Sequence, residues 1–182
     1  MASHSGWIDL NVNDARAPGQ PKWSNVNESS LPDGNLVSAY WAEKSLALGL
    51  NSSDIPEAWA FGGTADQADE LLGLVLSGKK TATSSSLWSY QAEEEPLPAV
   101  GELSIVCDGQ GRPRALLRVT DVTVADFDDV SERHAFAEGE GDRTLASWRP
   151  LHEDFFRSQL PAGCELTGSM PVVLESFERL AP

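Results

Sequence analysis

Apolar side chains recur at helical spacing in the first half of the chain. Between residues 64 and 78, apolar residues stand at positions 68, 71, 72 and 75, which places them on one helix face. Thr64 and Gln67 have capping-box spacing at its start, and Gly78 occupies the place of a C-terminal glycine. An earlier helix is predicted over residues 36–48, with Asn35 as its cap and Gly49 as its stop. Residues 51–58, between the two helices, are expected to form a loop.

Strand patterns follow the second helix. Residues 103–107 and 115–120 are short apolar runs, and the turn residues 108–111 between them predict a hairpin. Residues 122–124 continue the second strand, and residues 172–180 are expected to form a closing strand. Residues 142–159 have a helical pattern, in which Pro150 predicts a kink or a division into two short helices. This order of elements predicts an α+β fold whose strands close a small barrel flanked by helices.

Residues 1–33 lack such periodicity. They are rich in Asn, Ser, Pro and Gly, so we expect a weakly ordered N-terminal arm. Residues 34–182 then form one domain, because 182 residues is the size of a single domain.

The composition predicts a cytoplasmic protein. No apolar run approaches the roughly 18 residues of a membrane span, and the N-terminus lacks the basic and apolar segments of a secretory signal. The two cysteines do not suggest a disulfide framework, and Cys107 is expected to pack in the core. We therefore expect no membrane partner.

The charge limits the nucleic acids that the protein can bind. The net charge is −15, from 13 basic residues against 28 acidic ones. Proteins that hold duplex nucleic acid neutralise phosphates with Lys and Arg, so duplex DNA is not an expected partner. A small basic site in one cleft is still compatible with this charge, because the summed charge does not describe a single cleft.

The segment after the second helix is the first candidate for chemistry. Lys79 and Lys80 are followed by Thr81, Thr83 and Ser84. Two cations beside several hydroxyls suit a phosphate or a developing oxyanion, and a buried lysine with a lowered pKa could act as a base or nucleophile. In an extended chain Thr81 and Thr83 point to one face and Lys80 to the other. The simpler interpretation is a lysine pair that the helix dipole favours.

The second candidate is the run Glu138-Gly139-Glu140-Gly141-Asp142. One carboxylate could be a general acid or base, or two could hold a divalent cation through water. The simpler interpretation is an acidic loop that caps the next helix, with Asp142 at the helix N-terminus.

Aromatic residues and histidines add little by themselves. Trp88 and Tyr90 could stack on bases near a basic site, although such residues are more often packed in the core. His4, His134 and His152 show no metal-ligand spacing, so no structural zinc site is predicted.

These segments together resemble the ASCH family. The resemblance rests on residues 59–62, 74–83, 95–102 and 138–142, and on Leu145, Trp148, Arg149, His152, Phe155 and Phe156. The order and spacing agree over more than half of the chain. The combination GKKTAT and EGEGD is more specific than either motif alone.

The resemblance implies a PUA-like β-barrel with a cleft lined by the lysine segment and the EGEGD loop. The family is linked to RNA, and some members resemble ribonucleases of single-stranded RNA. A shorter relative is an amidohydrolase of acetylated cytidine that uses a Lys, a Thr three residues later and a Glu. By motif these fall on Lys80, Thr83 and Glu140, with Glu138 as the alternative to Glu140.

Three functions are therefore expected in order. The first is hydrolysis of single-stranded RNA, with Lys80 stabilising charge and Glu140 moving protons or holding a divalent ion. The second is deacetylation of a modified nucleoside by Lys80, Thr83 and Glu140. The third is binding of RNA or a small ligand without catalysis. Substrate contacts are expected from Lys79, Thr81, Ser84, Trp88, Tyr90 and Asp142. No cofactor is predicted other than a possible divalent metal ion.

Overall fold

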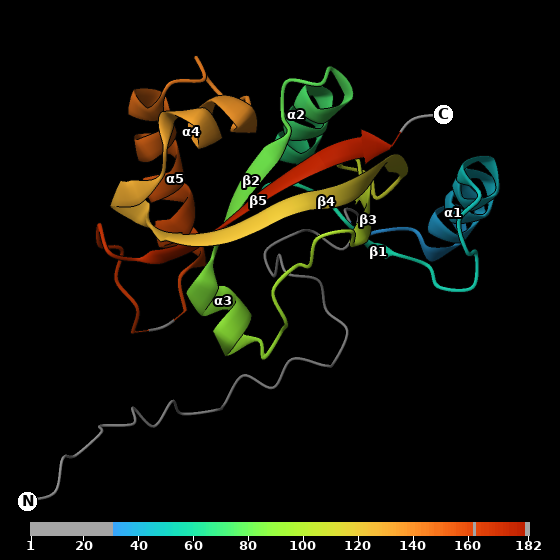
Figure 1. Ribbon diagram of the computed structural model, residues 1–182, viewed down its shortest axis with the longest axis horizontal. Coiled ribbons are helices and arrows are strands. Elements are labelled where there is room, and N and C mark those ends of the chain that lie inside the picture. The colour runs from blue at the N-terminus through green and yellow to red at the C-terminus, as the bar shows by residue number, and fades with distance from the viewer. Residues whose placement is uncertain (1–30, 162, 181–182) are drawn as a thin grey trace, which may run out of the picture.

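The computed structural model describes residues 31–161 and 163–180 (Figure 1). Most of the predicted N-terminal arm, residues 1–30, lies outside the described residues. In chain order the elements are α1 (Gly34–Leu48), β1 (Glu57–Trp59), α2 (Ala65–Leu76), β2 (Ala82–Ser86), α3 (Leu87–Ala92), β3 (Leu103–Cys107), β4 (Pro113–Asp126), a 3-10 helix (Phe127–Asp129), α4 (Glu132–Glu138), α5 (Leu145–Gln159) and β5 (Pro171–Leu180).

The strands form one mixed five-stranded sheet in the order β1-β3-β4-β5-β2. The β1–β3 pair is parallel, and the other pairs are antiparallel. A β-bulge interrupts the register of β4 against β5 between Val119 and Asp121, and bulges of this kind increase the local twist of a strand. The sheet curls into a half-barrel, which confirms the predicted α+β, PUA-like fold.

Helices pack against the sheet in three places. Both faces can carry a helix, because successive side chains of a strand point to opposite faces. Phe177 of β5 packs with Leu72 and Val75 of α2. Ile105 and Leu116, which pair across β3 and β4, pack instead with α1.

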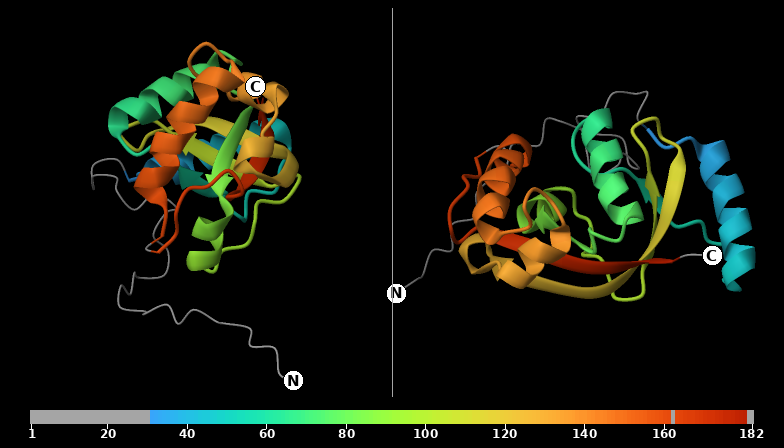
Figure 2. Two further views of the ribbon diagram at one scale, coloured as in Figure 1. Left: turned by 90° about the vertical axis from the view of Figure 1, so that its left-hand side faces the viewer. Right: turned by 90° about the horizontal axis from the view of Figure 1, so that it is seen from above.

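The far ends of β4 and β5 carry a separate core beneath α5. Val172 and Leu174 pack there with Trp148 and Phe156. The right-hand view of Figure 2 shows α1 and α5 at opposite ends of the long β4–β5 ribbon. No helix among the described residues is long and apolar enough to cross a membrane.

The helix starts show how well local signals predict structure. Thr64 caps α2 as expected, accepting a hydrogen bond from the backbone N–H of Gln67 at 3.2 Å, and Gly78 has a φ of 73°. The predicted cap of α1 is wrong. The cap is Asp33, whose carboxylate accepts from the backbone N–H groups of Asn35 and Leu36. The helix therefore begins two residues before the predicted position.

Pro150 does not divide the last helix, so of the two predicted alternatives, a kink or a pair of short helices, the second is wrong. One helix runs over Leu145–Gln159 with Pro150 inside it. The proline removes one backbone donor, but Trp148, His152 and Phe156 on the same helix are all buried. Tertiary packing therefore maintains the helix across the proline.

The remaining strands and helices were predicted unevenly. The predicted strands 103–107, 115–124 and 172–180 are confirmed as β3, β4 and β5, and Cys107 is buried in the core as expected. The loop predicted over residues 51–58 overlaps β1, so this strand was missed. It has three residues and is too short to show alternation. Helices α3 and α4 have six and seven residues and were also missed, because neither is long enough to establish a helical period.

Gly139 ends α4 at a position where a side chain would be strained. Its φ is 79°, and an added Cβ would lie 2.6 Å from the carbonyl oxygen of Lys79. We expect Gly139→Ala to lower the free energy of unfolding by roughly 1–3 kcal/mol, measured by urea denaturation.

The matched control is Gly73→Ala in α2, where nothing lies within 4 Å of an added Cβ. This substitution should raise stability by about 0.5–1 kcal/mol, because alanine is the better helix former. Equal midpoints for the two variants would show that position 139 tolerates a side chain.

Candidate functional site

Lys80 is a fully buried lysine with a relative exposure of 2%. It follows the glycine turn at the end of α2, where the backbone N–H of Lys79 and that of Lys80 both donate to the carbonyl of Leu74. The side chain of Lys80 then points inward and Lys79 stays exposed. The ammonium of Lys80 donates to Glu138 Oε2 at 3.0 Å and to Glu140 Oε1 at 2.7 Å.

Two carboxylates decide the charge of Lys80. Burial alone would lower the pKa of Lys80, but the neighbouring Glu138 and Glu140 raise it above its ordinary value. Lys80 is therefore a permanent cation at neutral pH. It is suited to stabilising negative charge and not to acting as a base or nucleophile.

Glu138 connects three parts of the fold. Its Oε1 accepts from Ser84 Oγ of β2 at 2.6 Å and from Trp148 Nε1 of α5 at 2.8 Å. The Nε2 atoms of His134 and His152 lie 3.3 and 3.4 Å from its carboxylate oxygens. Burial by itself would raise the pKa of Glu138, but Lys80 and these partners hold it well below the ordinary value. The carboxylate is therefore ionised although it is buried.

Two contacts with Trp148 hold the ring of His152 in place. It stacks on Trp148 with ring centroids 4.0 Å apart, and its Nδ1 lies 3.0 Å from the backbone carbonyl of the same residue. A carbonyl oxygen only accepts hydrogen bonds, so Nδ1 must carry the hydrogen. The Nε2 atom can then donate to Glu138 only when the imidazole is protonated.

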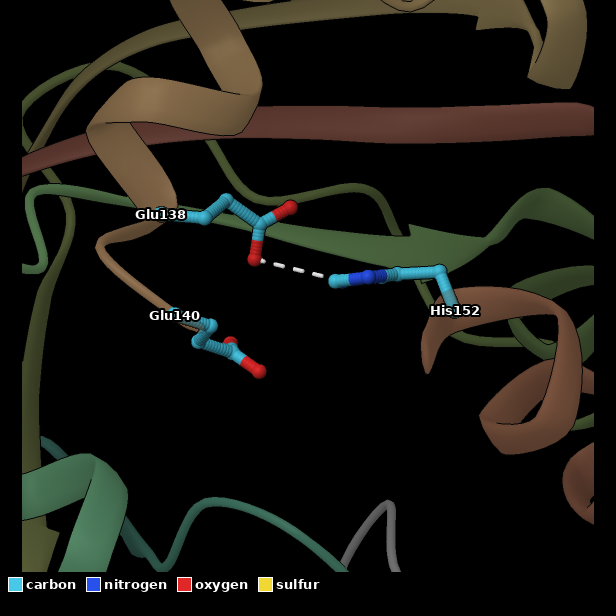
Figure 3. Close-up of side chains that lie close together, drawn as sticks. All are labelled: Glu138, Glu140 and His152. Carbon is cyan, nitrogen blue, oxygen red and sulfur yellow. Dashed lines mark ion pairs between the residues drawn. The ribbon is translucent and has the colours of Figure 1, made fainter. Parts of the chain in front are cut away.

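Glu140 is the accessible member of this cluster. Its side chain is 23% exposed, whereas those of Lys80 and Glu138 are each 1% exposed. Figure 3 shows Glu138 and Glu140 on one segment, with the ring of His152 approaching from α5. A substrate arriving from solvent would therefore meet Glu140 before Lys80.

The same residues could supply metal ligands. Glu138, Glu140 and His152 offer ligand atoms that lie within 4.8 Å of one another. However, the Lys80 ammonium already contacts both carboxylates. A divalent ion bound at these oxygens would be repelled by that ammonium, so binding would require Lys80 to move.

The third predicted catalytic residue, Thr83, lies elsewhere. Along β2, Ser84 points to Glu138 while the neighbouring Thr83 lines a pocket on the other side of the strand. Tyr90 of α3 also lines this pocket. The pocket is formed by Glu57, Trp59, Thr83, Ser85, Tyr90, Pro98, Glu102, Ser104, Val119 and Glu175. The structure thus brings Lys80 and Glu140 together and leaves Thr83 on a different surface.

Two of the predicted substrate contacts are occupied in the fold. Thr81 is exposed, and its hydroxyl donates to the carbonyl of Ala137 at 3.4 Å. Trp88 packs against the core beneath α5.

Asp142 fits the simpler interpretation of its segment, which is an acidic loop at the N-terminus of the next helix. Its carboxylate accepts from Ser147 and from Thr144, the N-cap of α5. These hydrogen bonds lower its pKa to about 2.

Sequence reasoning missed the roles of His134, His152 and Trp148. His134 and Glu138 are four residues apart on α4, so their proximity becomes visible only once α4 is recognised as a helix. Trp148 and His152 have the same spacing and share the predicted face of α5. That periodicity predicts a common face but does not identify Glu138 as the partner.

We expect Glu138→Gln to destabilise the protein by about 3 kcal/mol at pH 7, because it removes one charge from a buried pair. The folded-state pKa of Glu138 is lowered. Its stabilising contribution is therefore complete above the ordinary glutamate pKa of 4.5 and is lost as the pH falls towards the lowered value. The difference in free energy of unfolding between variant and wild type should therefore shrink as the pH is lowered below 4.5. Urea unfolding at a series of pH values measures it.

The control for this experiment is Glu178→Gln, because Glu178 forms an exposed ion pair with Arg118. That change should alter stability by less than about 1 kcal/mol. An equal loss in both variants, or a loss independent of pH, would contradict the assignment.

Comparison with known proteins supports the resemblance seen in the sequence. The ASCH domain family matches residues 57–181. One similar solved structure is the crystal structure of a protein from Enterococcus faecalis V583. Its sequence is 38% identical to this chain, the TM-score is 0.75, and the match covers 80% of this chain and 88% of that chain. A crystal structure of an ASCH domain from Lactobacillus crispatus JV V101 is 31% identical, with a TM-score of 0.69 over 78% of this chain and 92% of that chain. No curated protein matches.

The residues that carried the resemblance lie inside the matched range, and both relatives share most of their length with this chain. The half-barrel of the fold agrees with these relatives. The chain therefore belongs to the ASCH domain family.

Proposed function

We propose that Lys80 and Glu140 form a hydrolytic centre that acts on a nucleoside unit, either within single-stranded RNA or as a modified nucleoside. ASCH domains are generally RNA-binding. The observation that carries the proposal is a buried ammonium held between two carboxylates, one of which is open to solvent. Replacing such a buried pair by apolar residues is often neutral or stabilising, so folding alone gives little reason to keep it. Strongly perturbed charges of this kind are typical of functional sites.

Each member of the cluster has a separate task in this proposal. Lys80 stabilises the negative oxygen that develops in the transition state, because it is cationic and fixed in position. Glu140 moves protons, because it is partly exposed and hydrogen-bonded to Lys80. Glu138 is a positioning residue that orients Lys80 and acts through it.

The electrostatics favour deacetylation of an acylated nucleoside. A water molecule loses a proton to Glu140 and attacks the acetyl carbonyl, and Lys80 stabilises the resulting oxyanion. The tetrahedral intermediate breaks its C–N bond, and Glu140 returns the proton to the leaving amine, which gives acetate and the free nucleoside. Two carboxylates beside one lysine, in a protein of net charge −15, suit an uncharged substrate better than a phosphodiester. Thr83 takes no part in this step, because it lines a pocket on the other side of β2.

Cleavage of single-stranded RNA is the second candidate. It is favoured by the RNA binding typical of the family and by a cation that could stabilise a phosphorane. A divalent ion at this site would use Glu138, Glu140 and His152 as ligands, and Lys80 would have to move away from the two carboxylates. The two candidates differ in the bond that breaks and in their sensitivity to chelators.

The decisive experiment is mass spectrometry of products from acetylated cytidine and from a short single-stranded RNA, each with EDTA or with Mg²⁺. We expect cytidine and acetate from the wild type, unchanged by EDTA. Glu140→Gln should reduce the rate by about 10²-fold or more, through loss of the proton-transfer group. Lys80→Met, which keeps the length of the side chain without its charge, should cause a loss of about 10²–10³-fold.

Lys44→Met is the matched control, because Lys44 lies in α1 beside Tyr40. Circular dichroism should confirm that every variant is folded. Shortened RNA in place of cytidine would establish the ribonuclease alternative, with a metal ion involved if EDTA abolishes it. Full activity in Lys80→Met would remove Lys80 from the mechanism. Binding without any product would leave a binding module.

A further inference from the structure

Residues 59–62 helped to carry the resemblance to the ASCH family, yet none of them has a task in the hydrolytic centre. The structure places one of them, Phe61, against Lys80. The Lys80 ammonium lies over the ring of Phe61, 5.4 Å from the ring centroid. This distance is within the range of about 6 Å over which an aromatic ring attracts a cation. Phe61 is 4% exposed and Lys80 is 2% exposed, so water does not screen the attraction.

The start of α2 fixes the backbone that carries Phe61. The side-chain oxygen of Gln67, in the first turn of α2, accepts a hydrogen bond from the backbone N–H of Gly63 at 2.9 Å. Gly62 has a φ of 72°, and an added Cβ would lie 2.6 Å from Cβ of Gln67. The chain therefore turns sharply directly after Phe61, and the helix holds that turn in place.

The neighbours of Phe61 fix the orientation of its ring. Trp59 packs edge-on against it, with ring centroids 4.5 Å apart, and Phe177 of β5 packs at a tilt with centroids 6.2 Å apart. Leu72 of α2 belongs to the same buried cluster. A ring that is packed in this way cannot turn away from Lys80 without disturbing the core, because protein interiors have few voids.

The ring gives the ammonium something that an oxygen in its place would not give. An ammonium has three donors, and those of Lys80 reach Glu138 Oε2, Glu140 Oε1 and, at 3.5 Å, the backbone carbonyl of Glu138. The third contact is long for a hydrogen bond. An aromatic ring attracts a cation through its quadrupole and does not compete for that third N–H as an oxygen would. The third N–H is thus the one that a developing oxyanion can take.

We propose that Phe61 is a positioning residue of the hydrolytic centre, which holds the Lys80 ammonium through a cation–π contact and leaves one N–H to the substrate. The inference rests on the proposed function and deepens it, because it adds a residue that acts through Lys80. An aliphatic side chain of similar size would fill the space without this attraction. The role therefore depends on the electron density of the ring and not on its volume.

Site-specific incorporation of phenylalanines with one, two or three ring fluorines at position 61 tests this dependence. Fluorine withdraws electron density from the ring face and changes the volume of the side chain little. We expect the urea midpoint to fall with each added fluorine, by roughly 0.5–1 M with three, because the attraction to the buried ammonium weakens. The same series in a Lys80→Met background should show no such fall.

The matched control is the same series at Phe177, which is also 4% exposed and lies in the same buried cluster. Its midpoints should not follow the number of fluorines, because it is not the ring over Lys80. This comparison uses chains that keep Lys80, so it decides the question even where Lys80→Met does not fold.

The kinetic measurement uses acetylated cytidine or the short single-stranded RNA, whichever the protein hydrolyses. We expect kcat to fall by roughly three- to tenfold across the series at position 61, because Lys80 is held less firmly against the transition state. KM should stay unchanged, since Phe61 does not touch the substrate. A residue that only fills space would leave kcat constant across the series.

Equal midpoint shifts at positions 61 and 177 would overturn the proposal, as would a shift at position 61 that persists in folded Lys80→Met. Hydrolysis with a kcat that is indifferent to the fluorines would contradict only the present inference. A fluorine-dependent midpoint in a protein that hydrolyses neither substrate would contradict the proposed function and leave Phe61 as the residue that positions Lys80.

Discussion

The structure around the candidate site depends on one constraint, which is that a carboxylate cannot remain charged in the interior without partners. Glu138 meets this constraint with Lys80, with Ser84 of β2, and with Trp148 of α5. Each partner comes from a different segment. The hydrogen bonds that stabilise the charge of Glu138 therefore also hold α4 against β2 and α5. The electrostatics of the site and the packing of this end of the domain are therefore the same set of contacts.

The backbone permits this arrangement at a single close approach. Gly139 separates the buried Glu138 from the partly exposed Glu140 and lies against the backbone of Lys79 and Lys80. Its positive φ turns the chain so that two carboxylates, two positions apart in sequence, reach the same ammonium. In an extended strand such residues would also share a face, but here the shared orientation arises from a helix end followed by a turn.

Much of the fold could be predicted from the sequence because its signals are local. The cap at Thr64, the glycine at position 78 and the apolar runs of β3 and β5 each report on their own neighbourhood. The site could be predicted only in part. The motifs identified Lys80 and Glu140, but the contact between them spans 60 residues. Strand alternation, visible in the sequence, also separates Thr83 from the cluster, yet the motif by itself suggested that all three act together.

The long sequence separations in the cluster have a consequence for how the protein folds. Lys80 and Glu138 are 58 residues apart, and β2, which begins just after Lys80, pairs with the C-terminal strand β5. Contacts of high sequence separation must overcome the entropy of closing long loops, so they tend to form late. The buried charges are stable only when they are paired, so they must leave water as a group. The cluster therefore belongs to the same class of long-range contacts as the pairing of β2 with β5, and both depend on closing a loop of many residues.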